Sequence, residues 1–170
     1  MTLEEHITKW AGKTVDFDGV YPKQCMDLVH WYVYEVLGIS DKTVLAKPWA
    51  SKVYTEFSWP QYFNRIANST NNMPVKGDIA IYKEEINYDP AVKHGYGHIC
   101  VVTEANINNF KSFDANWPVG SLPHIQGHDY NSIWGWLHPI TQPQIDWRIK
   151  YQEILTYVRQ IRDVLRKIET

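Results

Sequence analysis

The spacing of apolar residues changes along this chain from a helical pattern after residue 25 to short apolar strands after residue 75. Two adjacent rows of apolar residues recur at four-residue steps, namely Leu28, Tyr32, Val36 and Val29, Val33, Leu37. This pattern predicts a helix with one wide apolar face, which Gly38 ends. We expect a shorter helix over residues 3–11 and irregular structure over residues 41–73.

Short apolar segments that favour strands occupy residues 79–82, 98–103, 110–117 and 133–137. Helices followed by antiparallel strands are typical of an α+β domain. Two prolines between residues 139 and 144 indicate a linker, so we expect one domain over residues 1–140 and a separate segment over residues 141–170.

The segment after the linker has its own helical pattern. Apolar residues alternate in steps of four and three at Trp147, Tyr151, Ile154, Val158, Ile161, Leu165 and Ile168. This spacing predicts an amphipathic C-terminal helix with a heptad seam. Two interpretations stay open: the helix packs on its own domain, or residues 147–168 mediate self-association or docking to another module.

Charge and hydropathy exclude several classes of protein. The net charge is −2, and nothing resembles the clustered basic residues of a nucleic-acid-binding protein. No apolar run approaches the roughly 20 residues that span a bilayer, so we expect no membrane partner. The acidic N-terminus lacks the basic start and apolar stretch of a signal peptide.

The two cysteines lie in different settings. Cys100 sits in an apolar run and is expected to be a buried core residue. Cys25 ends a loop and opens the predicted helix, where free N–H groups and the helix dipole favour a thiolate. Cys25 is therefore the candidate nucleophile, and it requires a base held by a third polar group.

Among the seven histidines, His98 is the best candidate base because it follows Gly97 and begins an apolar strand. Glycines beside His94 argue against a helical zinc site there. The others are expected at structural or surface positions (His6, His30, His138) or in a loop without acidic or thiol neighbours (His124, His128). For the third group, Asp114 and Asn116 are two residues apart, so in a strand they would share a face.

Three acids surround the cysteine. Asp16, Asp18 and Gly19 form a D-x-D-G loop of the kind that binds hard cations, Ca²⁺ above all. The remaining EF-hand ligands are absent, but Asp27 in the first helical turn could complete the site. Taken alone, the D-x-D-G loop is also typical of an ordinary surface turn. Asp27 alone is also typical of an acid in the first turn of a helix, where the helix dipole favours it.

Four segments occur in order: D-x-D-G-x-Y-x-x-Q-C-M-D, G-D-I-A, G-H-I-x-V-V and D-x-N-W. Together, over about residues 3–140, they resemble the CHAP family (cysteine, histidine-dependent amidohydrolases and peptidases) of bacteriophage endolysins. The resemblance implies a papain-like fold, with the nucleophile's helix packed on an antiparallel sheet. It also implies hydrolysis of peptidoglycan, either at the amide between muramic acid and L-Ala or within the stem or cross-bridge peptide, and lysis of Gram-positive cells.

Carried over by position, Cys25 is the nucleophile and His98 the general base. Asp114 stands where relatives often have Glu, and Asn116 matches their following Asn, so either is a candidate third group. Calcium-binding relatives use the acids of this loop, a backbone carbonyl and the acid two residues after the cysteine, which here are Asp16, Asp18, Val20 and Asp27. Some relatives add a His where this chain has Pro22, and we expect water there.

Two rival interpretations remain. An NlpC-type peptidase shares the Cys and His pair, although the D-x-D-G and D-x-N-W segments favour the CHAP family. The second rival is a noncatalytic wall-binding or phage structural module. Under this interpretation, the presence of Cys25, His98 and Asp114 would be a coincidence. If the chain is an endolysin, we expect it in the host cytoplasm during infection, with release to the cell wall by another agent.

Overall fold

The structure, a computed structural model, describes residues 1–86, 88–89, 94–140, 157–158 and 161–162. Met1–Ile140 form one compact unit, which contains the helices α1 (Leu3–Trp10), α2 (Cys25–Glu35) and α3 (Ala50–Thr55). Thr2 begins α1 with a capping box, in which its side chain accepts from the Glu5 N–H and the Glu5 carboxylate accepts from the Thr2 N–H. The sequence thus contains a clear start signal for the first helix.

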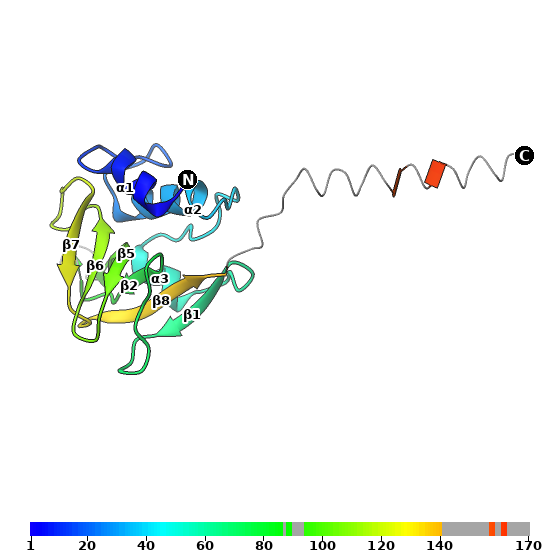
Figure 1. Cartoon of the computed structure of the whole chain (residues 1–170). Coiled ribbons are helices and arrows are strands. Elements are labelled where there is room, and N and C mark those ends of the chain that lie inside the picture. Colours follow the sequence, from blue (N-terminus) through cyan, green and yellow to red (C-terminus); the bar gives the residue numbers. More distant parts are fainter. Residues whose placement is uncertain (87, 90–93, 141–156, 159–160, 163–170) are drawn as a thin grey trace, which may run out of the picture. The chain divides into compact units, whose positions relative to one another are not determined.

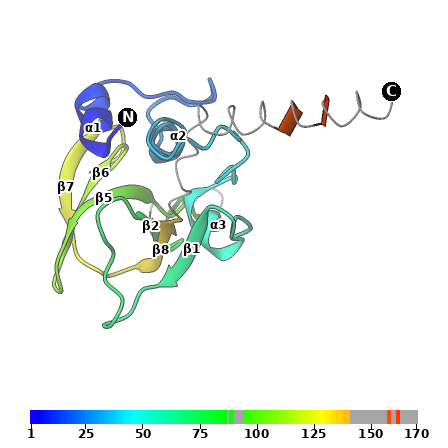
Figure 2. The same ribbon diagram turned by 45° about the vertical axis from the view of Figure 1, so that its right-hand side comes forward.

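Six strands form one antiparallel sheet in the order β1-β8-β2-β5-β6-β7 (Figure 1). They are β1 (Phe63–Ala67), β2 (Ile79–Tyr82), β5 (Ile99–Ala105), β6 (Phe110–Asp114), β7 (His124–His128) and β8 (Ile133–Pro139). A separate two-stranded ribbon pairs β3 (Tyr88–Asp89) with β4 (His94–Gly95). Figure 2 shows the sheet curving, with α2 seen almost along its axis on one side of it.

The sheet separates two apolar cores because side chains alternate along each strand. Ile79 and Ile81 of β2 pack with the apolar face of α2. Ala80 and Tyr82 of the same strand face the other way, into a second core that also contains Cys100. Helix α2 packs on β5, and α3 packs on β2 and β8, so α2 lies against the strand that directly follows the predicted base, His98.

The prediction of an α+β fold with N-terminal helices on an antiparallel sheet is confirmed. Several boundaries differ: α2 ends at Glu35 instead of Gly38, and β6 ends at Asp114 instead of residue 117. Helix α3 and strand β1 occupy the segment expected to be irregular, and β7 occupies an expected loop. β1 and β7 are edge strands with exposed positions, and pairing with β8 and β6 determines their structure more than their own sequence does.

The predicted linker and C-terminal heptad helix lie outside the described residues, except for four positions. Tyr157, Val158, Ile161 and Arg162 are helical in backbone and exposed. The heptad seam therefore stays a prediction. Among the helices of the described part, none has the length and apolar character needed to cross a bilayer.

Candidate active site

Cys25 is the first residue of α2 and is only 8% exposed. The preceding residue, Gln24, has an extended backbone, and its N–H donates to the Asp27 carboxylate at 3.0 Å. The helix therefore begins at the cysteine, and the N–H groups of its first turn have no partner within the helix. Cys25 therefore lies at the positive end of the α2 dipole.

His98 lies directly before β5 and is fully buried. Its Nε2 bonds Asp114 Oδ1, while its Nδ1 is buried and makes no regular hydrogen bond within the described part of the chain. Burial lowers the pKa of His98, but the negative charges of Cys25 and Asp114 outweigh it and raise the pKa to about 9. Nδ1 is therefore the ring nitrogen left to exchange a proton with Cys25.

Asp114 is fully buried at the end of β6 and accepts three hydrogen bonds. Besides His98, the donors are the Ser112 hydroxyl and Nε2 of His128, the latter at 2.7 Å. Burial alone would raise the pKa of Asp114, but the bonds from His128 and His98 hold it well below its usual range. The carboxylate is therefore ionised beside the base.

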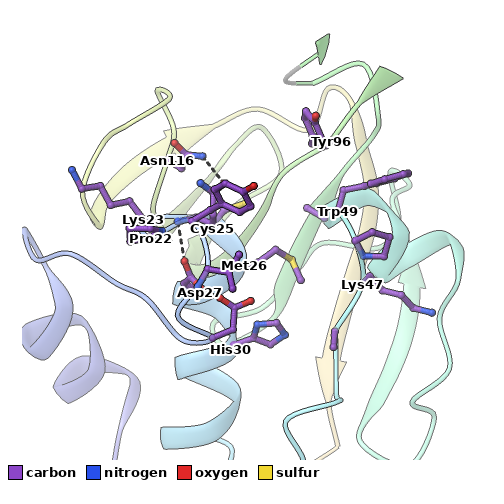
Figure 3. A pocket seen from close by; sticks show the side chains of 18 of the residues that line it. Pro22, Lys23, Cys25, Met26, Asp27, His30, Lys47, Trp49, Tyr96 and Asn116 are labelled. Carbon is purple, nitrogen blue, oxygen red and sulfur yellow. Dashed lines mark hydrogen bonds between the residues drawn. The ribbon is translucent and has the colours of Figure 1, made fainter. Parts of the chain in front are cut away.

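Asn116 takes a different position from Asp114, because β6 ends at Asp114 and the strand alternation ends with it. Asn116 has a positive φ of 62°. Its amide donates to Gln24 Oε1 at 3.2 Å, and its Oδ1 accepts from the Gly120 N–H at 2.6 Å. The expectation that Asp114 and Asn116 share a strand face is wrong, and Asn116 supports the residue before Cys25 (Figure 3).

The three acids that the sequence singles out are brought together. Carboxylate oxygens of Asp16, Asp18 and Asp27 all lie within 4.8 Å of one another. Asp16 and Asp18 are exposed, and each accepts one backbone N–H of the turn, from Gly19 and Val20 respectively. Asp27 is only 3% exposed, so the cluster extends from the surface to the base of α2.

The charge of this cluster is poorly compensated by the protein. Burial, followed by the charges of Asp18 and Asp16, raises the pKa of Asp27 to about 6, although hydrogen bonds from the Phe17 and Gln24 N–H groups lower it. Three carboxylates this close repel each other unless a cation or protons intervene. An all-oxygen donor set fits a hard cation such as Ca²⁺. Val20 lies in the same turn, with its N–H bonded to Asp18.

A pocket of about 1150 Å³ lies over Cys25. Figure 3 shows one wall formed by the loop and the start of α2, with Pro22, Lys23 and Met26, and the opposite wall with Lys47, Trp49 and Tyr96. His98 is not part of the lining and lies buried behind the cysteine. A substrate in this pocket would reach the sulfur while the base stays shielded from water.

Two residues that bond Asp114, Ser112 and His128, were not found by sequence reasoning. His128 was expected in a loop without acidic neighbours, which is wrong, because it lies on β7 and bonds Asp114. His124 lies on the same strand but bonds the Leu122 carbonyl. The register of β7 on β6 places His124 opposite Asp114 and His128 opposite Phe110. The bond from His128 to Asp114 therefore depends on how the side chains pack, and no local motif predicts it. Cys100 is fully buried, as its apolar run predicts.

Comparison with known proteins agrees with this geometry. The family model of the CHAP domain matches residues 15–116, a segment that includes Cys25, His98, Asp114 and the acidic cluster. Among solved structures, the wild-type endolysin LysIME-EF1 is similar with a TM-score of 0.60 and 26% sequence identity, covering 84% of this chain and 66% of that one.

The fold is also similar to that of Ly7917, with a TM-score of 0.57 at 15% identity, covering 79% of this chain and 60% of that one. A structure of Ly7917 with the hydrolyzing product of MDP gives a TM-score of 0.53 at the same identity and coverage. At this identity the likeness shows the fold alone. The present chain spans less than two thirds of the length of these solved chains.

Proposed function

Because this chain belongs to the CHAP domain family, we propose that it is a peptidoglycan hydrolase that cleaves an amide bond by a cysteine mechanism. The observation that carries the proposal is the chain of Cys25, His98 and Asp114, in which Cys25 lines an open pocket and the other two residues are buried. Each group has the chemical character that its step needs: a thiol at a helix start, a base with a raised pKa, and an ionised carboxylate.

In the proposed reaction, His98 Nδ1 takes the proton of Cys25, and the thiolate attacks the carbonyl carbon of the substrate amide. Backbone N–H groups at the start of α2, with Gln24 beside them, would stabilise the oxyanion. His98 then protonates the leaving amine. Water adds to the thioester, and its hydrolysis releases the acyl group and restores the thiol. Asp114 keeps the imidazole oriented and stabilises its positive charge.

The bond cleaved would be either the amide between N-acetylmuramic acid and L-alanine or one within the stem or cross-bridge peptide. Both are secondary amides, and the pocket above Cys25 is large enough for either. Mass spectrometry of digested muropeptides distinguishes them: a new free lactyl carboxylate on the muramyl group indicates an amidase, and a new peptide terminus indicates an endopeptidase. Walls of Gram-positive cells left intact by the folded protein would contradict both.

We also propose that the acidic cluster binds Ca²⁺. Asp16, Asp18 and Asp27 supply converging carboxylates, and the Val20 carbonyl and water would complete the oxygen donors. The fit rests on the poorly compensated charge of the buried Asp27. Bound Ca²⁺ would supply charge neutralisation, with no contact to the substrate. With its charge neutralised, the loop that contains Asp16 and Asp18 would be ordered where it joins the start of α2.

Two further proposals concern the protein in its setting. We propose that the chain resides in the host cytoplasm during phage infection and acts on the wall after release. We also propose that residues 147–168 associate with a second copy or with a wall-binding module. Light scattering tests self-association, since a mass of 19.9 kDa at all concentrations would exclude it. Docking to another module and packing on its own domain would then remain.

A further inference from the structure

The carboxylate of Asp114 has a second histidine on the side away from the base. One oxygen, Oδ1, bonds His98, and the other, Oδ2, accepts from Nε2 of His128 at 2.7 Å. The two rings come from different parts of the sheet, His98 from the start of β5 and His128 from the end of β7. The buried acid is therefore held between two imidazoles.

The ring of His128 is itself held in place. Its side chain is only 6% exposed. It stacks on Phe110 with ring centres 5.2 Å apart, and it makes edge contacts with Tyr82 at 5.5 Å and Trp117 at 5.6 Å. A donor packed by three aromatic rings has little freedom to turn away from its acceptor.

We infer that His128 is a positioning residue of the reaction, which acts through Asp114 by fixing the orientation and the charge of the carboxylate that holds His98. This inference rests on the proposed function, since it assigns His128 a role in that same site. Neither the position of His128 in the sequence nor the order of the four motif segments suggests such a role.

The need for a second donor follows from the burial of Asp114. An ionised carboxylate removed from water is costly unless its lone pairs are satisfied by hydrogen bonds. Asn116 bonds Gln24 and Gly120 instead, so it does not supply the missing donor. Ser112 does donate to Oδ2, but a hydroxyl hydrogen can rotate to another acceptor. His128 is the donor whose direction is fixed by packing.

The alternative is that His128 only fills space among the aromatic rings. Two substitutions separate the roles. His128→Phe keeps a ring and removes the donor, whereas His128→Gln keeps an N–H donor of similar reach and removes the ring. His124→Phe on the same strand is the control, because His124 is the strand neighbour of Asp114 but its ring bonds the Leu122 carbonyl instead of the carboxylate.

The first readout needs no wall substrate. It is the rate at which iodoacetamide alkylates Cys25, followed by peptide mass mapping across a range of pH. We expect His128→Phe to slow alkylation near neutral pH by about 10- to 100-fold, by analogy with the loss that follows removal of an outer hydrogen-bond partner of a metal ligand. His128→Gln should stay within about threefold of wild type, and His124→Phe should be unchanged.

The pH profile adds a signature that packing alone would not give. Without the His128 bond, Asp114 protonates more readily, so the acidic inflection of Cys25 alkylation should move to higher pH. The titratable groups that face Asp114 and His128 are His98, Cys100 and Tyr82, with Asp129 acting on Tyr82. Burial raises the pKa values of Tyr82 and Cys100 above their usual ranges, so both stay neutral and do not produce this inflection.

The second readout is hydrolysis of a soluble muropeptide. His128→Phe should lower kcat by a similar factor with KM nearly unchanged, since the pocket walls are untouched. Alkylation and kcat that are normal in His128→Phe, or equally slow in His128→Gln, would overturn the inference. If wild-type protein cleaves no wall material but the alkylation pattern holds, the proposed function fails and the positioning role stands.

A measurement on the wild-type protein covers the case in which His128→Phe does not fold. The Nε2 proton of His128, donated to a buried carboxylate, should exchange slowly with water and give a resolved low-field proton resonance. His128→Gln should remove this resonance and leave that of His98. A His128 proton in fast exchange with solvent would contradict the inference.

Discussion

The buried carboxylate of Asp27 accepts a hydrogen bond from the backbone N–H of Phe17, ten residues earlier, at 3.1 Å. Its other oxygen accepts from the N–H of Gln24, the residue before Cys25. One side chain of α2 thus ties the middle of the acidic loop to the start of the helix that carries Cys25. A cation or proton that neutralises the Asp27 carboxylate should therefore also affect the backbone geometry at Cys25.

Removal of Ca²⁺ should loosen this connection. At 100 times its dissociation constant, a ligand adds about 2.7 kcal/mol of stability, which corresponds to roughly 5–10 °C in Tm for a domain of this size. We expect chelation to lower Tm by this amount and added Ca²⁺ to restore it. Differential scanning calorimetry, with hydrolysis measured in parallel, is the appropriate measurement.

Asp16→Asn should abolish the calcium response, because it removes one charged ligand from the surface end of the cluster. Asp41→Asn is the matched control: Asp41 is also an exposed acid that accepts a backbone N–H in a turn, from Thr43, but it lies outside the cluster. A Tm that neither chelation nor Ca²⁺ changes in the wild-type protein would refute the calcium site.

The two cysteines should differ in function. Cys25→Ala removes the nucleophile, and lysis of Gram-positive cells followed by turbidity should fall by more than about a thousandfold. Cys100→Ala leaves a small cavity in the second core, so it should cost about 1 kcal/mol of stability and leave hydrolysis within about tenfold. Persistent lysis by Cys25→Ala would show that the cysteine mechanism is wrong.

The raised pKa of His98 predicts how stability depends on pH. A group whose pKa rises on folding, here from 6.5 to about 9, stabilises the folded state below its unfolded pKa and loses that contribution as pH rises through its folded pKa. The free energy of unfolding should therefore fall between about pH 6.5 and pH 9. Chemical denaturation at a series of pH values measures this.

Two variants identify His98 as the group responsible. His98→Gln should flatten the decline above pH 6.5. Cys25→Ser removes a negative charge that raises the pKa of His98, so the decline should move to lower pH. The lowered pKa of Asp114 acts at the other end of the range, because its contribution is present above the unfolded value of 3.8 and is lost as pH falls below it. An unchanged decline in His98→Gln would assign it to another group.

The parts of the fold that sequence reasoning recovered are those with strong local signals. The apolar rows after Cys25 predict α2, and the run Ile79–Tyr82 is a strand with the expected bounds. The positions of Cys25 at a helix start and of His98 at a strand start are also as predicted, because both starts are visible in the sequence. Their contact could not be derived from spacing, because 73 residues separate them and only the packing of α2 on β5 brings them together.

The errors concern residues whose position depends on a strand end or on strand pairing. Asn116 was expected beside Asp114, but the strand alternation ends where the chain turns with a positive φ at Asn116. His128 was expected to lack an acidic partner, because β7 is short, polar and half exposed. Its structure depends on pairing with β6, which leaves no periodic signal in its own sequence.

Gly97 offers a test of how closely the base is held by its surroundings. A Cβ at this position would lie 2.8 Å from the Tyr82 carbonyl oxygen and 2.9 Å from the Ser51 Cβ, and the backbone has a φ of +67°. Gly97→Ala therefore combines an unfavourable backbone conformation with a clash against backbone and a short side chain. We expect a loss of about 2–4 kcal/mol in stability and a displaced His98, with hydrolysis reduced more than Tm alone would explain.

Gly12→Ala is the matched control for that substitution, because Gly12 has the same φ of +67° but no heavy atom within 4 Å of the added Cβ. It should cost only the backbone term, about 1 kcal/mol, and leave hydrolysis unchanged. The difference between the two variants in chemical denaturation measures the clash beside His98. Equal losses of stability, with normal hydrolysis in both, would mean that the close approach of Tyr82 and Ser51 does not position the base.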